Sequence, residues 1–237
     1  MAKTCAISQS NYIPWKGYFD QINMVDEFVI YDCVQFTRRD WRNRNTIKTP
    51  KGPQWLTIPV ENKGNYFARI DAMTIADPTW SANHWKSISM NYAKAPYFGE
   101  YKDGLKELYN GAVSTSLSEI NRQFLVYICS LLGIKTRITN STDYELVDDK
   151  NLRLVHICKQ LGANTYYSGP AAKSYLDEGL FESNGIKVVW MDYSGYPEYE
   201  QVHPPFTHAV SIIDLLLNQG PNATKYMKSF NPALLAS

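Results

Sequence analysis

The sequence predicts an α/β fold with a wound, mostly parallel sheet of about five strands, Rossmann-like in its winding. In three places a helical pattern ends at a glycine, Gly133, Gly162 or Gly185, and a short apolar strand pattern follows at once. Glycine ends helices readily because it adopts the left-handed conformation at little cost. Helices and strands that alternate in this way are typical of a parallel sheet covered by helices. No linker or repeat interrupts the chain, so we expect one domain over residues 1–237.

The front of the chain contains two predicted strands with a helix between them. Residues 4–8 form a short apolar run, which indicates a buried strand. Pro14 suits the first turn of the helix, where its missing N–H would have no partner in any case, and the helical pattern extends to about Met24. Residues 27–32 are almost continuously apolar, which predicts a second strand covered on both faces.

An antiparallel hairpin is predicted as an insertion after the second strand, and a helical segment follows it. Residues 46–49 and 55–60 have strand-like patterns and flank a turn sequence at 50–52. The remaining elements are then expected as helices at about 80–94, 98–109, 116–132, 149–161 and 209–218, and as strands at 135–139, 165–167 and 187–190.

Composition excludes several classes of protein. The net charge of +1 gives no general case for binding nucleic acids or acidic membranes. The sequence shows no signal peptide and no apolar run of about eighteen residues, so we expect a cytoplasmic protein without a membrane partner. The four cysteines form no CxxC pair and no zinc spacing. Motifs such as GxGxxG, GxxxxGKS/T and HExxH are absent, so no metal and no cofactor are expected.

Polar residues follow every predicted strand, at the ends where ligands bind in open α/β sheets. Loops are polar in general, but the loops after the first, second and fourth strands carry small amide and hydroxyl groups at helix starts. The polar residues of the five loops, in chain order, are Ser8, Gln9, Ser10, Asn11 and Tyr12, then Asp32 and Gln35, then Asn140, Ser141 and Thr142, then Ser168 and Gly169, then Asp192 and Tyr193. We expect these loops to converge on one rim.

The start of the first helix is a candidate anion site. A helix amino terminus presents free N–H groups and a partial positive charge. Trp15 and Lys16 stand there, and Lys16 would add a full charge. The alternative is an ordinary exposed lysine, which is the more common case.

A basic segment follows the second strand. Between residues 38 and 51 stand six basic residues and one acidic residue, a local excess of five positive charges: Arg38, Arg39, Arg42, Arg44, Lys48 and Lys51, with Asp40. Arginine matches phosphate oxygens with two hydrogen bonds, and Trp41 among these arginines could stack a base. The segment therefore indicates a phosphate-bearing substrate. The alternative is a solvated hairpin edge protected by charge.

The four histidines give two candidate bases. His84 opens a predicted helix and His203 lies in a loop close to Tyr199 and Gln201. Either could accept a proton near neutral pH, although a single histidine is more often structural. His156 lies within a predicted amphipathic helix, and we expect it to be structural.

Several motifs together resemble the WbqC-like protein family over almost the whole chain. The opening motif is residues 9–19, Gln-Ser-Asn-Tyr-Ile-Pro-Trp-Lys-Gly-Tyr-Phe. The other matching segments are 32–36, 41–45, 55–60, 84–85, 92 with 95–98, 166–170, 175–176, 185–186, 199 with 201, and 211–216. Cys33 stands where the family's motif usually has a second aspartate, which argues against a thiol nucleophile at this position.

The resemblance implies a place in bacterial surface-polysaccharide (O-antigen) biosynthesis. It also implies transfer of a glycyl or other acyl group to an amino sugar. The partners would then be a nucleotide sugar and an activated acyl or aminoacyl donor, such as a charged tRNA or a carrier protein. The chain is accordingly interpreted as an acyl or aminoacyl (glycine) transferase.

Residue roles follow from this hypothesis. Asp32 or His84 would take a proton from the attacking amine, and Ser168 with the Gly169 N–H would stabilise the oxyanion. The candidate substrate-binding residues are Gln9, Asn11, Tyr12, Trp15, Lys16, Gln35, Arg38, Trp41, Arg42, Asn43, Arg44, Asn45, Gly169, Tyr199, Gln201 and His203.

Two other functions remain open at this point. The first is a nucleotide-dependent ligase or nucleotidylyl transferase with a HUP-like fold, because the predicted sheet is similar to that of such enzymes. Their His-x-Gly-His signature is absent, and residues 14–18 occupy its place. The second is a non-catalytic protein that binds nucleotide sugars or RNA through the basic segment.

Overall fold

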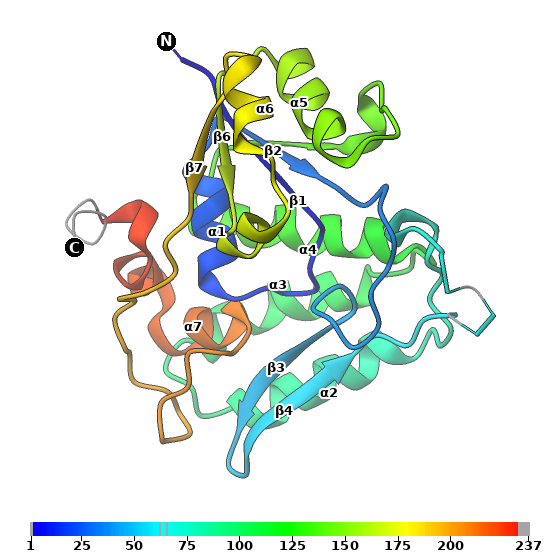
Figure 1. Cartoon of the computed structure of the whole chain (residues 1–237). Coiled ribbons are helices and arrows are strands. Elements are labelled where there is room, and N and C mark those ends of the chain that lie inside the picture. The colour runs from blue at the N-terminus through cyan, green and yellow to red at the C-terminus, as the bar shows by residue number, and fades with distance from the viewer. Residues whose placement is uncertain (1, 62, 65, 232–237) are drawn as a thin grey trace.

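The computed structural model describes residues 2–61, 63–64 and 66–231. Within them it confirms the predicted α/β fold, with a five-stranded parallel sheet and a separate two-stranded antiparallel sheet (Figure 1). The parallel strands are β1 (Thr4–Ser8), β2 (Glu27–Ile30), β5 (Arg137–Asn140), β6 (Thr165–Ser168) and β7 (Lys187–Trp190), in the spatial order β5-β2-β1-β6-β7. The chain winds outward from β1 in both directions. The switch point, where such sheets bind ligands, therefore lies between β1 and β6.

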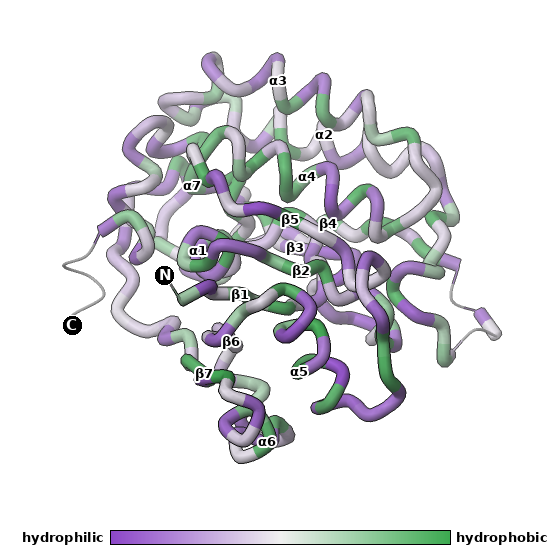
Figure 2. Tube along the Cα trace, turned by 90° about the horizontal axis from the view of Figure 1, so that it is seen from above, coloured by the Kyte–Doolittle hydropathy of each residue, from purple (hydrophilic) through white to green (hydrophobic). Residues whose placement is uncertain are grey.

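Helices cover both faces of the parallel sheet. They are α1 (Lys16–Asn23), α2 (Trp80–Tyr92), α3 (Phe98–Asn110), α4 (Leu117–Leu132), α5 (Lys150–Leu161), α6 (Glu178–Ser183) and α7 (Ile212–Gln219). Short 3₁₀ helices lie at Ile70–Ala72, Ser141–Asp143, Pro170–Ser174, Gly220–Tyr226 and Lys228–Phe230. Figure 2 shows α5 and α6 on one side of the sheet and α1, α4 and α7 on the other, with α2 and α3 outside them.

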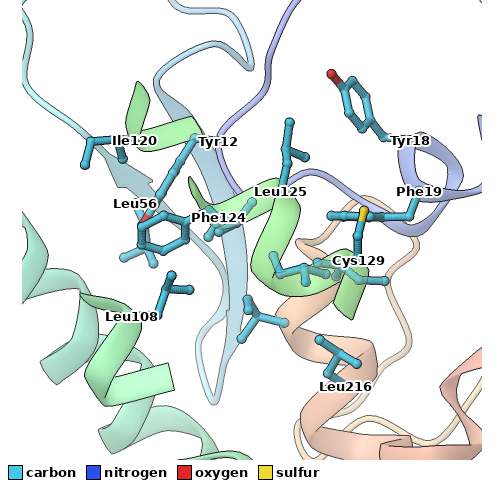
Figure 3. Close-up of a cluster of buried hydrophobic side chains, with 14 of the residues drawn as sticks. Tyr12, Tyr18, Phe19, Leu56, Leu108, Ile120, Phe124, Leu125, Cys129 and Leu216 are labelled. Atoms are coloured by element: carbon cyan, nitrogen blue, oxygen red, sulfur yellow. The ribbon is translucent and has the colours of Figure 1, made fainter. Parts of the chain in front are cut away.

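The core is divided by the sheet into two clusters. Alternate residues of β1 point to opposite faces, so Ala6 packs in the larger cluster while Cys5 and Ile7 pack in the smaller one. Figure 3 shows part of the larger cluster, where Tyr12 and Phe124 lie together. Their ring centres are 5.7 Å apart. The loop after β1 is thereby anchored in the core next to the sheet.

The hairpin is present, but its second strand begins earlier than the sequence indicated. It consists of β3 (Arg44–Thr49) and β4 (Gly52–Thr57) instead of 46–49 and 55–60. Gly52 has a φ of 102°, which an L-residue side chain disfavours, so the chain reverses sharply and pairing resumes at once. In Figure 1 the hairpin lies below the parallel sheet, on the side of the strands' carboxyl ends.

Other element boundaries also shift, for local reasons. α1 begins at Lys16 and not at Pro14, because the backbone of Trp15 is extended, with a ψ of 168°, and Ile13 before it has a non-helical φ of 37°. α7 begins at Ile212 and not at 209, because the side chain of Ser211 accepts a hydrogen bond from the Ile213 N–H and caps the helix there. The glycine joints are confirmed: Gly133 and Gly162 have φ values of 73° and 67°.

The carboxyl-terminal segment is tied to α1 through Asp20, which is fully buried. Its carboxylate accepts hydrogen bonds from the backbone N–H groups of Lys228 and Ser229, both at 2.9 Å, and from the hydroxyl of Tyr196 at 2.6 Å. In the described part of the chain no helix is long and apolar enough to cross a membrane. Nor does any group of histidine, cysteine, aspartate and glutamate residues there have the arrangement of a metal site.

Candidate functional site

A hollow of about 290 Å³ lies where the loop after β1 meets the loop before β3 and the segment before α7. Trp15 and Trp41 contribute indole rings to its lining, and Asn11, Asn45 and His208 contribute polar groups. The lining is completed by Pro14 and Ala209. Four of the predicted substrate-binding residues thus meet in one concave site.

Trp15 is held in place by aromatic neighbours and by a glycine. Its ring lies 5.3 Å from the rings of both Tyr193 and Tyr196, in edge-on arrangements. A Cβ atom on Gly17 would stand only 2.4 Å from the Trp15 indole. Glycine at this position therefore lets the indole lie against the first turn of α1.

Replacing Gly17 with alanine is expected to force the Trp15 indole out of this position and to destabilise the protein. The added methyl group overpacks the contact, which typically costs about 1–3 kcal/mol. Thermal unfolding and near-ultraviolet circular dichroism would detect both effects. Gly99→Ala in α3 is the matched control, because a Cβ there meets nothing within 4 Å. Equal thermal stability and equal aromatic dichroism for the two variants would contradict this account.

Trp41 is supported from the hairpin. Its ring centre is 5.3 Å from that of Trp55 on β4, at an angle of 34°. The guanidinium of Arg44 lies 4.2 Å from the centre of the Trp55 ring, and it also donates to the backbone oxygen of Arg39. Arg44 therefore supports the stack behind Trp41 and does not line the hollow.

Arg42 and Asn45 shape the loop that forms the hollow. Arg42 Nη1 donates to the Asn11 side-chain oxygen at 2.5 Å and to the backbone oxygens of Gln9 and Ser10, both at 3.3 Å. Asn45 Nδ2 donates to the backbone oxygens of Tyr12 and Ile13, at 3.1 and 3.0 Å.

These contacts leave the side-chain nitrogen of Asn11 available to a ligand. With its Oδ1 engaged by Arg42, Asn11 keeps its Nδ2 group without a hydrogen-bond partner in the described part of the chain, and the residue borders the hollow. Asn11 can therefore donate to a bound molecule.

Asp32 lies behind this loop and is buried. Its carboxylate accepts hydrogen bonds from the Ser10 N–H at 2.8 Å, the Ser10 hydroxyl at 2.7 Å and the Ser118 hydroxyl at 2.5 Å. Burial raises the pKa of Asp32, and the hydrogen bonds from Ser118 and Ser10 oppose this shift. Asp32 also borders a second hollow of about 210 Å³, which Asn140 and Ser141 line after β5. Its contacts fix the Ser10 end of the loop.

Among the described residues that line the hollow, His208 is the titratable one. Partial burial and the nearby Lys16 ammonium both lower its pKa from 6.5, and Glu198 opposes them. The imidazole is therefore neutral at neutral pH and can accept a proton. Sequence reasoning counted His208 among the histidines but gave it no role. The sequence shows that His208 stands directly before α7. That position indicates a site residue only once the segment before α7 is known to lie beside β3.

Lys16 lies next to the hollow, in a buried position. Its ammonium donates to the backbone oxygen of Pro197 at 2.9 Å and lies over the rings of Tyr196 and Tyr199, at 5.0 and 5.3 Å. Burial lowers the pKa of Lys16 to about 8. Lys16 is therefore not the exposed surface lysine that was the alternative from the sequence. It is a buried, partly desolvated cation next to the hollow.

His84 and Tyr12 lie in the core and not at the hollow. His84 Nε2 donates to the backbone oxygen of Thr57 at 3.2 Å, so in the neutral ring Nδ1 accepts from the Tyr12 hydroxyl, 2.9 Å away. The Tyr12 hydroxyl in turn lies 2.8 Å from that of Tyr109. Burial lowers the pKa of His84 to about 4. Both side chains are therefore placed to hold the loop after β1 against β4 and the core.

Tyr199 and Gln201 contact a buried carboxylate that the sequence did not single out. The hydroxyls of Tyr92 and Tyr199 donate to Asp214 at 2.7 and 2.8 Å, and Gln201 donates to it at 2.9 Å. Burial raises the pKa of Asp214 in spite of these bonds. His203 bonds separately to the backbone oxygen of Asn91 at 2.7 Å. This network orders the segment before α7 that carries His208.

The remaining predicted site residues lie around the hollow or farther away. Ser168 is buried at the end of β6, and a Cβ on the neighbouring Gly169 would lie 3.8 Å from the hydroxyl of Tyr193, which packs on Trp15. The others do not line the hollow: Gln35 donates to the backbone oxygen of Tyr66 at 2.8 Å, Asn43 donates to that of Ile58 at 2.8 Å, and Arg38 lies 4.6 Å from the centre of the Tyr66 ring.

Fold and site together define an α/β protein with a Rossmann-like parallel sheet and a tryptophan-lined hollow near the carboxyl ends of its strands. The chain belongs to the WbqC-like protein family, which it matches over residues 9–226. A protein of Mycobacterium tuberculosis (strain ATCC 25618 / H37Rv), described as Uncharacterized protein Rv1507c, is 50% identical over 226 residues, which are 95% of this chain and 98% of that protein. No solved structure matches the chain.

Proposed function

We propose that this protein is a transferase that adds a glycyl or other acyl group to the amino group of a nucleotide-activated amino sugar. The product would serve bacterial surface-polysaccharide (O-antigen) biosynthesis in the cytoplasm. The observation that carries the proposal is the hollow between Trp15 and Trp41, with the Asn11 amide and the His208 imidazole in its lining. Membership of the WbqC-like family agrees with it.

The size and chemistry of the hollow suit one sugar ring. Its volume of about 290 Å³ lies just below the roughly 300–1,000 Å³ of pockets that enclose whole drug-sized ligands. Indole faces pack well against the C–H face of a pyranose, and a free amide can bond its hydroxyls. The nucleotide would then extend out of the hollow, and Gln9, Arg42 and Asn45 would position the loop that binds the sugar.

His208 is placed to act as the general base. The sugar's amine nitrogen attacks the acyl carbonyl carbon, a C–N bond forms, and the bond from that carbon to the donor's oxygen or sulfur breaks. The neutral His208 imidazole takes the proton from the amine and returns it to the departing oxygen or sulfur. In this reading Asp32 positions the loop through Ser10, and Ser168 with Gly169 supports the Tyr193 side of the hollow.

Purified protein is incubated with UDP- or dTDP-amino sugars and activated glycyl or other acyl donors, and the acylated sugar is detected by mass spectrometry. We expect Trp41→Ala to weaken sugar-nucleotide affinity at least about tenfold, because a tryptophan wall is lost. We expect His208→Asn to lower kcat about a hundredfold. Calorimetry and single-turnover kinetics separate the two effects.

Matched variants control for nonspecific damage. Tyr175→Ala removes an exposed aromatic residue that does not line the hollow, and His156→Asn alters an exposed histidine on α5. Both are expected to leave affinity and kcat unchanged. Absence of an acylated product with every sugar and donor would refute the proposal.

A nucleotide-dependent ligase or nucleotidylyl transferase is the second candidate. The strand order, with its switch point between β1 and β6, favours it, because nucleotides bind at such points in open α/β sheets. Release of pyrophosphate from ATP or another nucleoside triphosphate would identify this reaction. Acyl transfer without pyrophosphate release would exclude it.

A further inference from the structure

Exposed aromatic side chains concentrate on one part of the molecule. Among the described residues, the exposed aromatic side chains of the hairpin and its flanking loops are Trp41, Trp55, Tyr66 and Phe67, with exposed fractions of 41, 46, 59 and 87%. Large apolar side chains that remain together in contact with solvent commonly mark a binding surface. Most of the protein's other aromatic residues are buried or half-buried. The exposed aromatic residues of this region therefore indicate a surface that binds another molecule.

Basic residues are interleaved with these aromatic residues. Arg38 lies over the Tyr66 ring and Arg44 over the Trp55 ring, at 4.6 and 4.2 Å from the ring centres. Arg39, Lys51 and Lys63 of the same region are exposed. Three of the six basic residues at positions 38–51 are therefore exposed, Arg44 is half-buried, and Arg42 and Lys48 point inward and bond to backbone oxygens.

We propose that this aromatic–basic surface, formed by Arg38, Arg39, Arg44, Trp55, Tyr66 and Phe67, binds an unpaired segment of RNA. The inference rests on the proposed function in one respect: the RNA would be the carrier of the activated acyl group. Trp41 connects the surface to the hollow, because it lines the hollow and stacks on Trp55. An acyl group at the end of a bound RNA would thus be delivered beside the sugar.

The alternation of rings and guanidinium groups favours RNA over an acidic carrier protein. Unpaired bases stack on aromatic faces while phosphates between them pair with arginine, so single-stranded nucleic acids require both groups at short intervals. The planar guanidinium of arginine suits both kinds of contact, because it stacks on aromatic faces and matches the oxygens of a phosphate. Protein interfaces are also enriched in aromatic residues and arginine. The alternation of rings with cations along the surface, and not the composition alone, is therefore what favours RNA.

The test measures binding of a fluorescently labelled 12-nucleotide single-stranded RNA by anisotropy, between 50 and 200 mM salt, without any acyl-transfer reaction. We expect affinity to fall steeply with salt. Trp55→Ala should weaken binding about fivefold to a hundredfold. Arg38→Gln should reduce the salt slope by about 0.7, the value for one phosphate contact on a single strand.

Tyr175→Ala and Lys102→Gln are the matched controls, because both residues are exposed and lie on other elements. They should change neither affinity nor slope. Equal losses in Trp55→Ala and Tyr175→Ala, or no measurable RNA binding, would overturn the inference. So would transfer from an acylated carrier protein that charged RNA does not support.

The two proposals fail in different ways. Acyl transfer from a small activated donor, with no RNA binding, would refute the RNA surface and leave the proposed function standing. RNA binding that Trp55→Ala weakens, with no acyl transfer from any donor, would refute the transferase and support the RNA surface.

Discussion

Replacing Asp32 with alanine is expected to lower the free energy of unfolding by about 3–5 kcal/mol, because it leaves buried donors without their acceptor. The donors are the N–H and hydroxyl of Ser10 and the hydroxyl of Ser118. The Ser10 hydroxyl also accepts from Asn121 at 2.8 Å, so the loss extends to α4. Urea unfolding at pH 7, followed by far-ultraviolet circular dichroism, measures the effect.

Asp71→Ala is the control for this experiment. Asp71 pairs with Arg69, whose side chain is half exposed, and such surface ion pairs contribute at most about 1 kcal/mol. If Asp32→Ala unfolded at the same urea concentration as the wild-type protein but had lost acyl transfer, Asp32 would be a catalytic residue as first hypothesised. A large loss of stability supports its role in positioning the loop after β1.

His84 is expected to make the protein sensitive to acid. Burial lowers the pKa of His84 from 6.5 to about 4, so the folded protein binds this proton less readily than the unfolded chain. The stabilisation is complete above pH 6.5 and is lost as the pH falls from 6.5 to about 4. The loss amounts to about 3 kcal/mol, and urea unfolding at intervals across this pH range measures it.

The matched variant is His84→Gln, which can still bond to Tyr12 and Thr57 but does not titrate. Its stability should fall less between pH 6.5 and 4.5 than that of the wild-type protein. Asp32 and Asp214 titrate in both proteins, and their raised pKa values act in the opposite direction, so the difference between the two curves isolates His84. Parallel curves would show that His84 is not buried in its neutral form.

Much of the fold could be predicted from the sequence because local signals and packing agree. The glycine that ends each helix and the apolar run that follows are short-range features, and they identified Gly133, Gly162 and Gly185 correctly. Boundaries that depend on backbone angles or caps were less accessible. The positive φ of Ile13 and the cap at Ser211 cannot be read from hydrophobic periodicity.

The site was accessible in part. Four of the five residues that line the hollow from the opening motif and the hairpin region were among the expected substrate-binding residues: Asn11, Trp15, Trp41 and Asn45, but not Pro14. His84 was not distinguishable from a surface histidine, since one histidine in a helix gives no sign of which face is buried. The roles of His208 and Asp214 could not be predicted, because their positions depend on how the segment before α7 packs on β3. One contact of this packing is the hydrogen bond from the Ser211 N–H to the Thr46 oxygen at 2.9 Å.

The bond between Asp20 and Ser229 makes the ligand site depend on the far end of the chain. The same carboxylate orients Tyr196, and Tyr196 packs on the Trp15 indole. Deletions or fusions close to Ser229 are therefore expected to displace Trp15, which lies more than two hundred positions upstream, and so to change the shape of the hollow. In enzyme engineering and in comparisons of homologues, substitutions near Ser229 should therefore be considered together with substitutions in the hollow as changes that affect substrate affinity.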